Sequence, residues 1–168
     1  ADLGATSIGE MAAGGVVGLA GGRIEGVYIE GTFNAGSNRA YSSDHNVVID
    51  YAIGGVVGKT LETRALRLYN ILNAMEITGV GSTGAVVSSD ATKEIKTGGI
   101  IGEVVNAQNV RHFLGWITNA GEINVSSLST SGLRQYVGGV VGMSRGRAYK
   151  LASGFGEWTN QGLLDFTG

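Results

Sequence analysis

The stretch Gly54-Gly55-Val56-Val57-Gly58 occurs four times in this 168-residue sequence, with conservative changes. Its other copies are Gly14-Gly15-Val16-Val17-Gly18, Gly98-Gly99-Ile100-Ile101-Gly102 and Gly138-Gly139-Val140-Val141-Gly142, so successive copies start 40, 44 and 40 residues apart. A block that recurs at a nearly constant spacing is the signature of a repeat protein. We therefore predict a single repeat domain over residues 1–168, with repeats near 14–53, 54–97, 98–137 and 138–168 and a partial repeat over 1–13.

A second marker that begins with asparagine lies about halfway through each repeat. Its copies are Asn34-Ala35-Gly36, Asn73-Ala74-Met75, Asn119-Ala120-Gly121 and Asn160-Gln161-Gly162. Asparagine tolerates left-handed backbone and glycine adopts it without steric cost, so each marker predicts a tight corner. Strand patterns follow three of these corners, and others lie between the two markers and before each later Gly-Gly pair, at 47–49, 85–87 and 133–137.

Composition and repeat together predict the fold class. The sequence has 30 glycines and no proline, and only 15% of its residues are charged, which favours strands and turns over helices. Short strands with glycine corners, repeated in series, predict an all-β fold, a β-helix-like β-solenoid of four stacked repeats of about 40 residues. We expect a strand at each Gly-Gly-Val-Val-Gly block, with one valine facing the core and the other lying on the outer side or against a neighbouring segment. The flanking glycines would let another backbone segment approach closely.

Several function classes are disfavoured by what the sequence lacks. The net charge is −2 without a basic cluster, which argues against nucleic-acid binding. There is no cysteine for disulfides or thiolate metal sites, and no apolar run of roughly 20 residues that would span a membrane. The two histidines, His45 and His112, have no histidine or cysteine at ligand spacing, so we predict no metal site.

No catalytic constellation accompanies the repeat. The acidic residues are scattered along apolar strand patterns, which is typical of a solvated sheet face rather than of the paired carboxylates of a glycoside hydrolase. They include Glu25, Glu30, Glu76, Glu94 and Glu122. Lys59 follows only one of the four glycine blocks, which argues against a phosphate-binding loop. We predict no catalytic residue, no cofactor and no enzymatic activity.

Aromatic residues recur before the last two asparagine corners, at Phe113 and Trp116 and again at Phe155 and Trp158. Leu68 and Ile71 take the corresponding places in the second repeat, which favours a ladder of core side chains. The alternative is that Trp116 and Trp158 form an exposed platform on which a sugar stacks.

The first glycine block continues as Gly18-Leu19-Ala20-Gly21-Gly22-Arg23-Ile24, and this segment resembles the GLUG motif. Related glycine-rich repeats occur in bacterial surface proteins, including adhesin-like proteins and the non-catalytic part of some IgA-cleaving metallopeptidases. The later copies continue differently, with Lys59-Thr60-Leu61, Glu103-Val104-Val105 and Met143-Ser144-Arg145. The resemblance implies an extracellular, β-rich bacterial surface module without catalytic residues.

The leading functional prediction is a structural protein outside the cell or at its surface, either an adhesin segment or a self-assembling filament subunit. The terminal repeats have no polar cap, so we expect their strand edges to support a homo-oligomer or filament. The alternative is a module that binds a glycan or a host protein, and a carbohydrate-active enzyme is the weakest of the three hypotheses.

Overall fold

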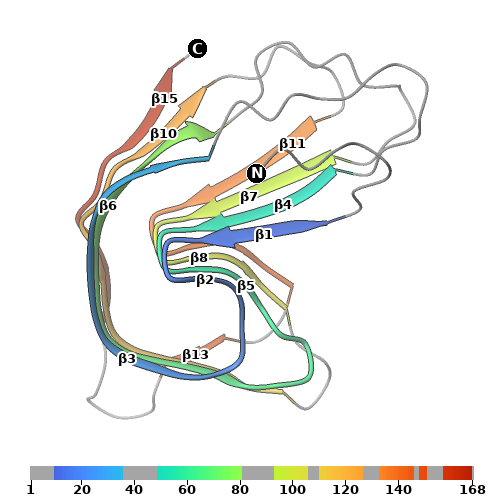
Figure 1. The fold of residues 1–168 in the computed structure, drawn as a ribbon, viewed down its shortest axis with the longest axis vertical. Coiled ribbons are helices and arrows are strands. Elements are labelled where there is room, and N and C mark those ends of the chain that lie inside the picture. Colours follow the sequence, from blue (N-terminus) through green and yellow to red (C-terminus); the bar gives the residue numbers. More distant parts are fainter. Residues whose placement is uncertain are drawn as a thin grey trace.

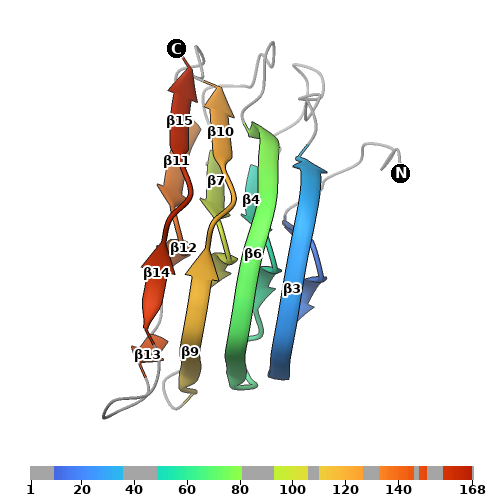
Figure 2. The ribbon, with the colours of Figure 1, turned by 90° about the vertical axis from the view of Figure 1, so that its left-hand side faces the viewer.

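The computed structural model describes residues 10–35, 49–80, 93–105, 110–126, 133–145, 148–150 and 157–167. Its regular structure consists of β-strands that pair in parallel, so the predicted all-β class is confirmed. The strands form three sheets, here called A, B and C (Figures 1 and 2). The described residues contain no helix with the length and apolarity that crossing a bilayer requires.

Each sheet collects equivalent strands from successive repeats. Sheet A is β1 (Met11–Gly14), β4 (Ile49–Gly54), β7 (Lys93–Gly98) and β11 (Leu133–Gly138), in that order. Sheet B is β2 (Val17–Ala20), β5 (Val57–Thr60), β8 (Ile101–Val104) and β12 (Val141–Ser144). Sheet C holds β3 (Gly22–Asn34), β6 (Leu66–Val80), β9 (His112–Asn119), β10 (Ile123–Ser126), β13 (Ala148–Lys150), β14 (Trp158–Asn160) and β15 (Leu164–Thr167).

The prediction of a β-solenoid is wrong, because the strands are arranged in three parallel sheets. At each Gly-Gly pair the chain turns back sharply, so that sheet B runs beneath sheet A while sheet C curves around the pair (Figure 1). Glycine makes this return possible. A Cβ added to Gly102 in sheet B would lie 2.4 Å from the Ile53 nitrogen in sheet A, and one added to Gly58 would lie 2.5 Å from the Ala13 nitrogen. The backbones of sheets A and B therefore touch, and the sequence pattern does not reveal this fold-back.

The glycine block itself is a corner and not a continuous strand. Sheet A ends at its first glycine, the next two residues bend, and sheet B begins at the second valine, as at Gly54 and Val57. The strand expected through the block is therefore wrong, and Val56 and Val57 are both fully buried, so neither takes the outer position. A bend breaks the two-residue period of a strand, which lets adjacent side chains enter the core together.

The asparagine marker meets the glycine corner in space. Asn73, Asn119 and Asn160 form a hydrogen-bonded asparagine ladder, with Nδ2 of each residue donating to Oδ1 of the next at 2.8 Å. A Cβ added to Gly99 would lie 2.3 Å from Cγ of Asn119, so the second glycine of the pair leaves room for the amide. The ladder explains why the two markers keep nearly the same separation in the later repeats.

The first repeat departs from this arrangement. The register of β3 against β6 aligns Ile29, and not Asn34, with Asn73. Asn34 instead ends β3, and Gly36, the last residue of the corner expected there, lies outside the described residues. The corners at Asn119 and Asn160 are confirmed, whereas β6 runs straight through Asn73.

Two apolar clusters fill the spaces between the sheets. The larger lies between sheets B and C and includes Val56, Ile100, Leu68 and Leu114. The smaller lies between sheets A and C and includes Ile53, Ile95, Ile77, Ile123 and Val125. Each cluster is built from side chains that occupy equivalent register positions, as Leu68 and Leu114 do.

Candidate functional site

The three sheets end in two open edges, which we call the first edge (β1, β2 and β3) and the last edge (β11, β12, β13, β14 and β15). Among the described residues, no strand pairs with the outer side of either edge. Figure 2 shows β3 at one side of sheet C and the β13–β15 segments at the other. An open parallel edge presents unpaired N–H and C=O groups, which makes it a template for pairing with another strand.

Hydrogen bonds at the glycine corners all run in one direction. The amides of Val16 and Val17 donate to the Val56 carbonyl at 3.1 Å, and those of Val56 and Val57 donate to the Ile100 carbonyl at 3.1 and 2.9 Å. Those of Ile100 and Ile101 donate to the Val140 carbonyl at 3.0 and 2.9 Å. Each corner therefore donates toward the next repeat. The first corner consequently presents carbonyls outward, and the last corner presents amides.

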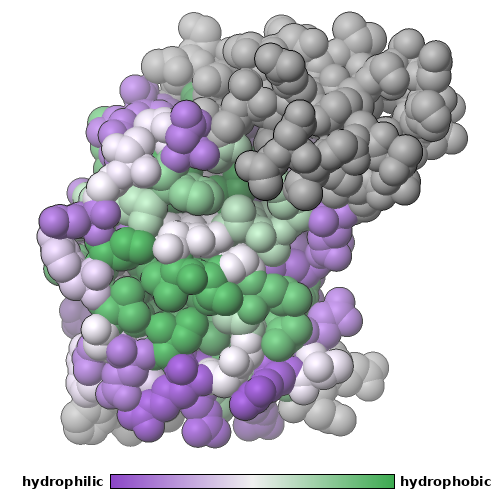
Figure 3. All heavy atoms as spheres, in the orientation of Figure 1, coloured by the Kyte–Doolittle hydropathy of each residue, from purple (hydrophilic) through white to green (hydrophobic). Residues whose placement is uncertain are grey.

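The first edge also exposes side chains whose equivalents are buried further along. Val16 is 48% exposed and Leu19 is 51% exposed, whereas Val56, in the register position of Val16, is fully buried. Val17, Ile24, Val27 and Ile29 are partly buried and pack against the larger cluster. Figure 3 shows this end of the molecule, with an apolar patch across β2 and the space toward β3. The patch consists of apolar side chains that belong to the core in the later repeats and are uncovered at the first edge, because no strand pairs there among the described residues.

Charged side chains fill the angle between sheets A and B on the side away from sheet C. This charged cluster consists of Glu10, Asp50, Glu94 and Lys96 from sheet A or beside it, and of Lys59, Glu103 and Arg145 from sheet B or beside it. Lys96 is completely buried and contacts Asp50, Glu94 at 3.4 Å and Glu103 at 3.2 Å. The prediction that Glu94 lies on a solvated sheet face is wrong, because the residue is buried.

Glu103 lies at the centre of the charged cluster, with 1% of its surface exposed. Its carboxylate contacts Lys59 at 3.4 Å, Lys96 at 3.2 Å and Arg145 Nε at 3.1 Å. A buried carboxylate needs such compensation because desolvation of an isolated charge costs several kcal/mol or more. The sequence indicated none of this, since these residues are distant in the chain and only the sheet register brings them together.

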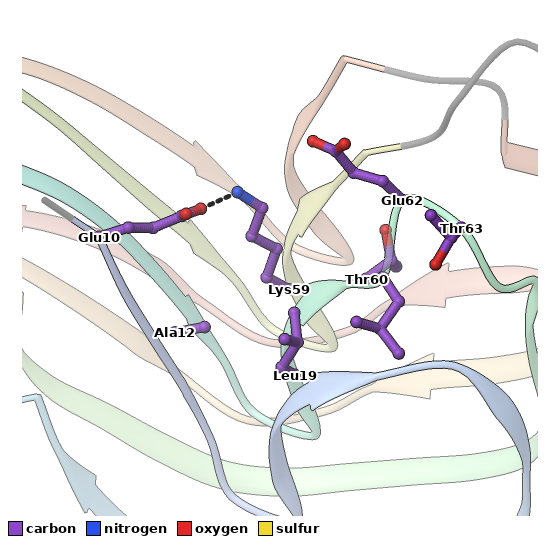
Figure 4. A pocket seen from close by; sticks show the side chains of 8 residues that line it. Glu10, Ala12, Leu19, Lys59, Thr60, Glu62 and Thr63 are labelled. Atoms are coloured by element: carbon purple, nitrogen blue, oxygen red, sulfur yellow. Dashed lines mark hydrogen bonds and ion pairs between the residues drawn. The ribbon is translucent and has the colours of Figure 1, made fainter.

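A pocket of about 520 Å³ opens beside this cluster, lined by Glu10, Leu19, Lys59, Thr60 and Glu62 among others (Figure 4). One carboxylate oxygen each from Glu10, Asp50 and Glu103 lies within 4.8 Å of the other two, which is close enough to hold a metal ion. Lys59 and Lys96 already contact these three carboxylates. A metal ion would have to displace ammonium groups, so the arrangement is better described as an ion-pair network.

His112 links two strands of sheet C and the segment after β8. Its Nδ1 accepts a hydrogen bond from the Leu66 amide at 3.0 Å, and Nε2 lies 2.7 Å from the Val105 carbonyl. Nε2 therefore carries the proton of a neutral imidazole. Burial lowers the pKa of His112, and the hydrogen bond to Val105 opposes this only in part. His45, the other histidine, lies outside the described residues.

The two tryptophans occupy different environments. Trp158 packs against the larger apolar cluster and donates from Nε1 to the Leu114 carbonyl at 3.1 Å. Trp116 is 48% exposed and has left-handed backbone with φ of 49°. The register places Trp158 opposite Ile117, one residue beyond Trp116. Trp158 is thus partly buried against the core and Trp116 lies on the outer side of sheet C, and the two indoles do not share one exposed surface.

A left-handed bulge explains the position of Trp116. Gly26, Asn70 and Trp116 all have positive φ, of 68°, 53° and 49°. The paired residues on both sides of these positions show that the three lie side by side in sheet C. A bulge turns one side chain away from its alternating position. Phe113 aligns with Arg67, whose guanidinium lies 5.8 Å from the ring centroid, and Phe155 lies outside the described residues.

Searches with this sequence and structure against protein-family models, curated proteins and solved structures found no match.

Proposed function

We propose that this chain is a structural, non-catalytic repeat protein that assembles end to end, the last edge of one copy pairing with the first edge of another. The main support for this proposal is that the first and last glycine corners are complementary. The last corner presents amides at the positions where the first corner presents carbonyls. In this arrangement the Val140 and Val141 amides of one copy donate to the Val16 carbonyl of the next. Each contact repeats one that already occurs inside the chain.

Apolar side chains support the same pairing. Extension of the observed register places Val140 over Val16 and Trp158 over Val27, and both members of each pair are incompletely buried in the single chain. Burial of a valine or leucine side chain that is half exposed contributes roughly 1 kcal/mol. Several such contacts along three sheets, together with backbone hydrogen bonds, favour association at moderate concentration.

The proposed setting is the outside of a bacterial cell, where the chain serves as a filament subunit or as a segment of an adhesin. The support is the resemblance of the first repeat to the GLUG motif, together with the repetitive architecture. In a repeat protein each repeat contacts only its neighbours, so a short sequence unit that is used again builds a long structure. Its closely paired strands would resist proteolysis.

Electron microscopy and light scattering over a concentration series test the assembly. We expect uniform fibres or stacks whose mean mass rises with concentration. Val16→Lys places a charge in the proposed junction and is expected to abolish assembly, because a buried unpaired charge is costly. Leu72→Lys is the matched control, since Leu72 is 39% exposed on β6, and β3 separates it from the proposed junction. Monomers of the unmodified chain at every concentration would contradict the proposal and favour pairing with other repeats of a longer protein.

A second candidate function, binding of a glycan, is favoured by the exposure of Trp116 alone. Its positive φ holds the indole on the outer side of sheet C with 48% of the residue exposed, and an exposed aromatic face is the kind of surface on which a sugar ring stacks. The test is tryptophan fluorescence during titration with oligosaccharides. A saturable change that Trp116→Ala removes would support the candidate, and an unchanged spectrum with a panel of bacterial and host glycans would count against it.

A further inference from the structure

A column of charged residues runs across sheet A from one edge to the other. The register of β4, β7 and β11 aligns Asp50 with Glu94 and Glu94 with Arg134. Glu10 immediately precedes Met11, which pairs with Tyr51, so Glu10 stands beside Asp50. Neighbouring strands of a sheet are about 4.8 Å apart. The column therefore holds three adjacent carboxylates and one guanidinium group at its far end.

Lysine and arginine side chains compensate the carboxylates unevenly. Glu94 contacts Lys96 and Arg145, and Asp50 contacts Lys96, so both internal members of the column are paired. Glu10 contacts Lys59, yet its side chain remains 51% exposed at the first edge. The charged cluster as a whole has four carboxylates, Glu10, Asp50, Glu94 and Glu103, against three cations, Lys59, Lys96 and Arg145. One negative charge is thus left over at the first edge.

Arg134 is the natural partner for that charge. It is exposed on the last edge and has no ion-pair partner in the described part of the chain. Gly138, Gly98, Gly54 and Gly14 are aligned through successive strand pairs. When one copy follows another in the same register, Gly138 therefore meets Gly14. Arg134 and Glu10, each four residues earlier, then face each other.

We propose that Arg134 of one copy pairs with Glu10 of the next, and that this pair selects a head-to-tail junction in the register of the internal repeats. The inference rests on the assembly proposed above and specifies its partner and polarity. A head-to-head junction would place the Glu10 carboxylates and the outward corner carbonyls of both copies in one interface without Arg134. A tail-to-tail junction would place the Arg134 guanidinium groups of both copies in one interface without Glu10.

Charge reversal on each side of the junction tests the pair. In Glu10→Arg, two arginines meet at every junction, and in Arg134→Glu, two glutamates meet. We expect each variant alone to assemble only at a concentration roughly tenfold higher than the unmodified chain, because like charges at an interface oppose association. An equimolar mixture of the two variants restores opposite charges at both kinds of junction. Its assembly concentration is expected to return to within about threefold of the original.

Circular dichroism and thermal unfolding of each variant as a monomer establish that the substitutions leave the fold intact. Arg134→Lys keeps the positive charge, retains assembly and serves as the conservative control. If the unmodified chain assembles while both reversals assemble equally well, the Arg134–Glu10 pair is refuted and end-to-end assembly stands. If the unmodified chain stays monomeric, both proposals fail. If the mixture stays as weak as the single variants, the register is refuted.

Discussion

Substitution of Gly102 by alanine tests the close contact between sheets A and B. A Cβ at this position would lie 2.4 Å from the Ile53 nitrogen, 2.6 Å from the Gly58 oxygen and 2.7 Å from the Ile53 oxygen. All three are backbone atoms of neighbouring strands, which cannot rotate away as a side chain can. Overpacking of a well-packed core costs typically 1–3 kcal/mol, and contact with fixed backbone places this variant at about 3 kcal/mol or more.

Gly26→Ala is the matched control for this effect. An added Cβ at Gly26 meets nothing within 4 Å, but its φ of 68° is left-handed. The expected cost is therefore backbone strain alone, about 1–2 kcal/mol. Urea unfolding measures the free energy of unfolding of both variants. In thermal unfolding, a loss of about 3 kcal/mol corresponds to a fall of roughly 6–12 °C in Tm for a domain of this size. A Gly102→Ala variant that is as stable as Gly26→Ala would refute the backbone contact between the two sheets.

Three further predictions concern the buried polar groups. Lys96→Met leaves Glu103 without one of its compensating cations, and we expect a loss of about 3–5 kcal/mol in urea unfolding; a loss below about 1 kcal/mol would show that the cluster is solvated. Asn119→Ala removes the middle of the asparagine ladder and its hydrogen bond with Asn73, with an expected loss of about 1–3 kcal/mol by the same measurement. Burial lowers the pKa of His112, so as pH falls below about 6.5 the histidine takes up a proton in the unfolded chain before it does so in the folded one. The contribution of His112 to the free energy of unfolding is therefore complete above about pH 6.5 and is lost as pH falls toward the folded-state pKa. His112→Gln is expected to reduce this decline in unfolding experiments between pH 7 and pH 5, and an identical pH profile would contradict the assignment.

Strand patterns in the sequence located β10 and β11 but missed β7, which contains charged residues. The pattern at 133–137 agrees with β11, and the pattern after Asn119 agrees with β10. The strand expected at 85–87 lies outside the described residues, whereas β7 is at Lys93–Gly98. Charged residues in β7 concealed it, because the burial of Lys96 depends on ion pairs that include partners on other strands, Asp50 and Glu103.

The candidate sites divide in the same way. Trp116 and Trp158 were recognisable as a repeated feature, but their spacing did not indicate which of them faces the core. The left-handed backbone at Trp116 shifts the alternation of inward and outward side chains by one residue, so that Ile117 takes the core position while the register with β6 is unchanged. Bulges are local departures from alternation and leave no clear trace in a hydrophobic pattern.

The sequence by itself determined the repeat, its spacing and the all-β class, because composition and periodic markers are properties of the chain alone. It also located the corners at Asn119 and Asn160, but not the fold-back at the glycine blocks, where glycine is required by close contact between backbones. Only the tertiary structure decided that the repeats form three parallel sheets, that sheets A and B meet backbone to backbone, and that the asparagines stack beside the glycine corners. It also decided where the buried charges are compensated. These features depend on contacts between residues some 40 positions apart, which local preference does not specify.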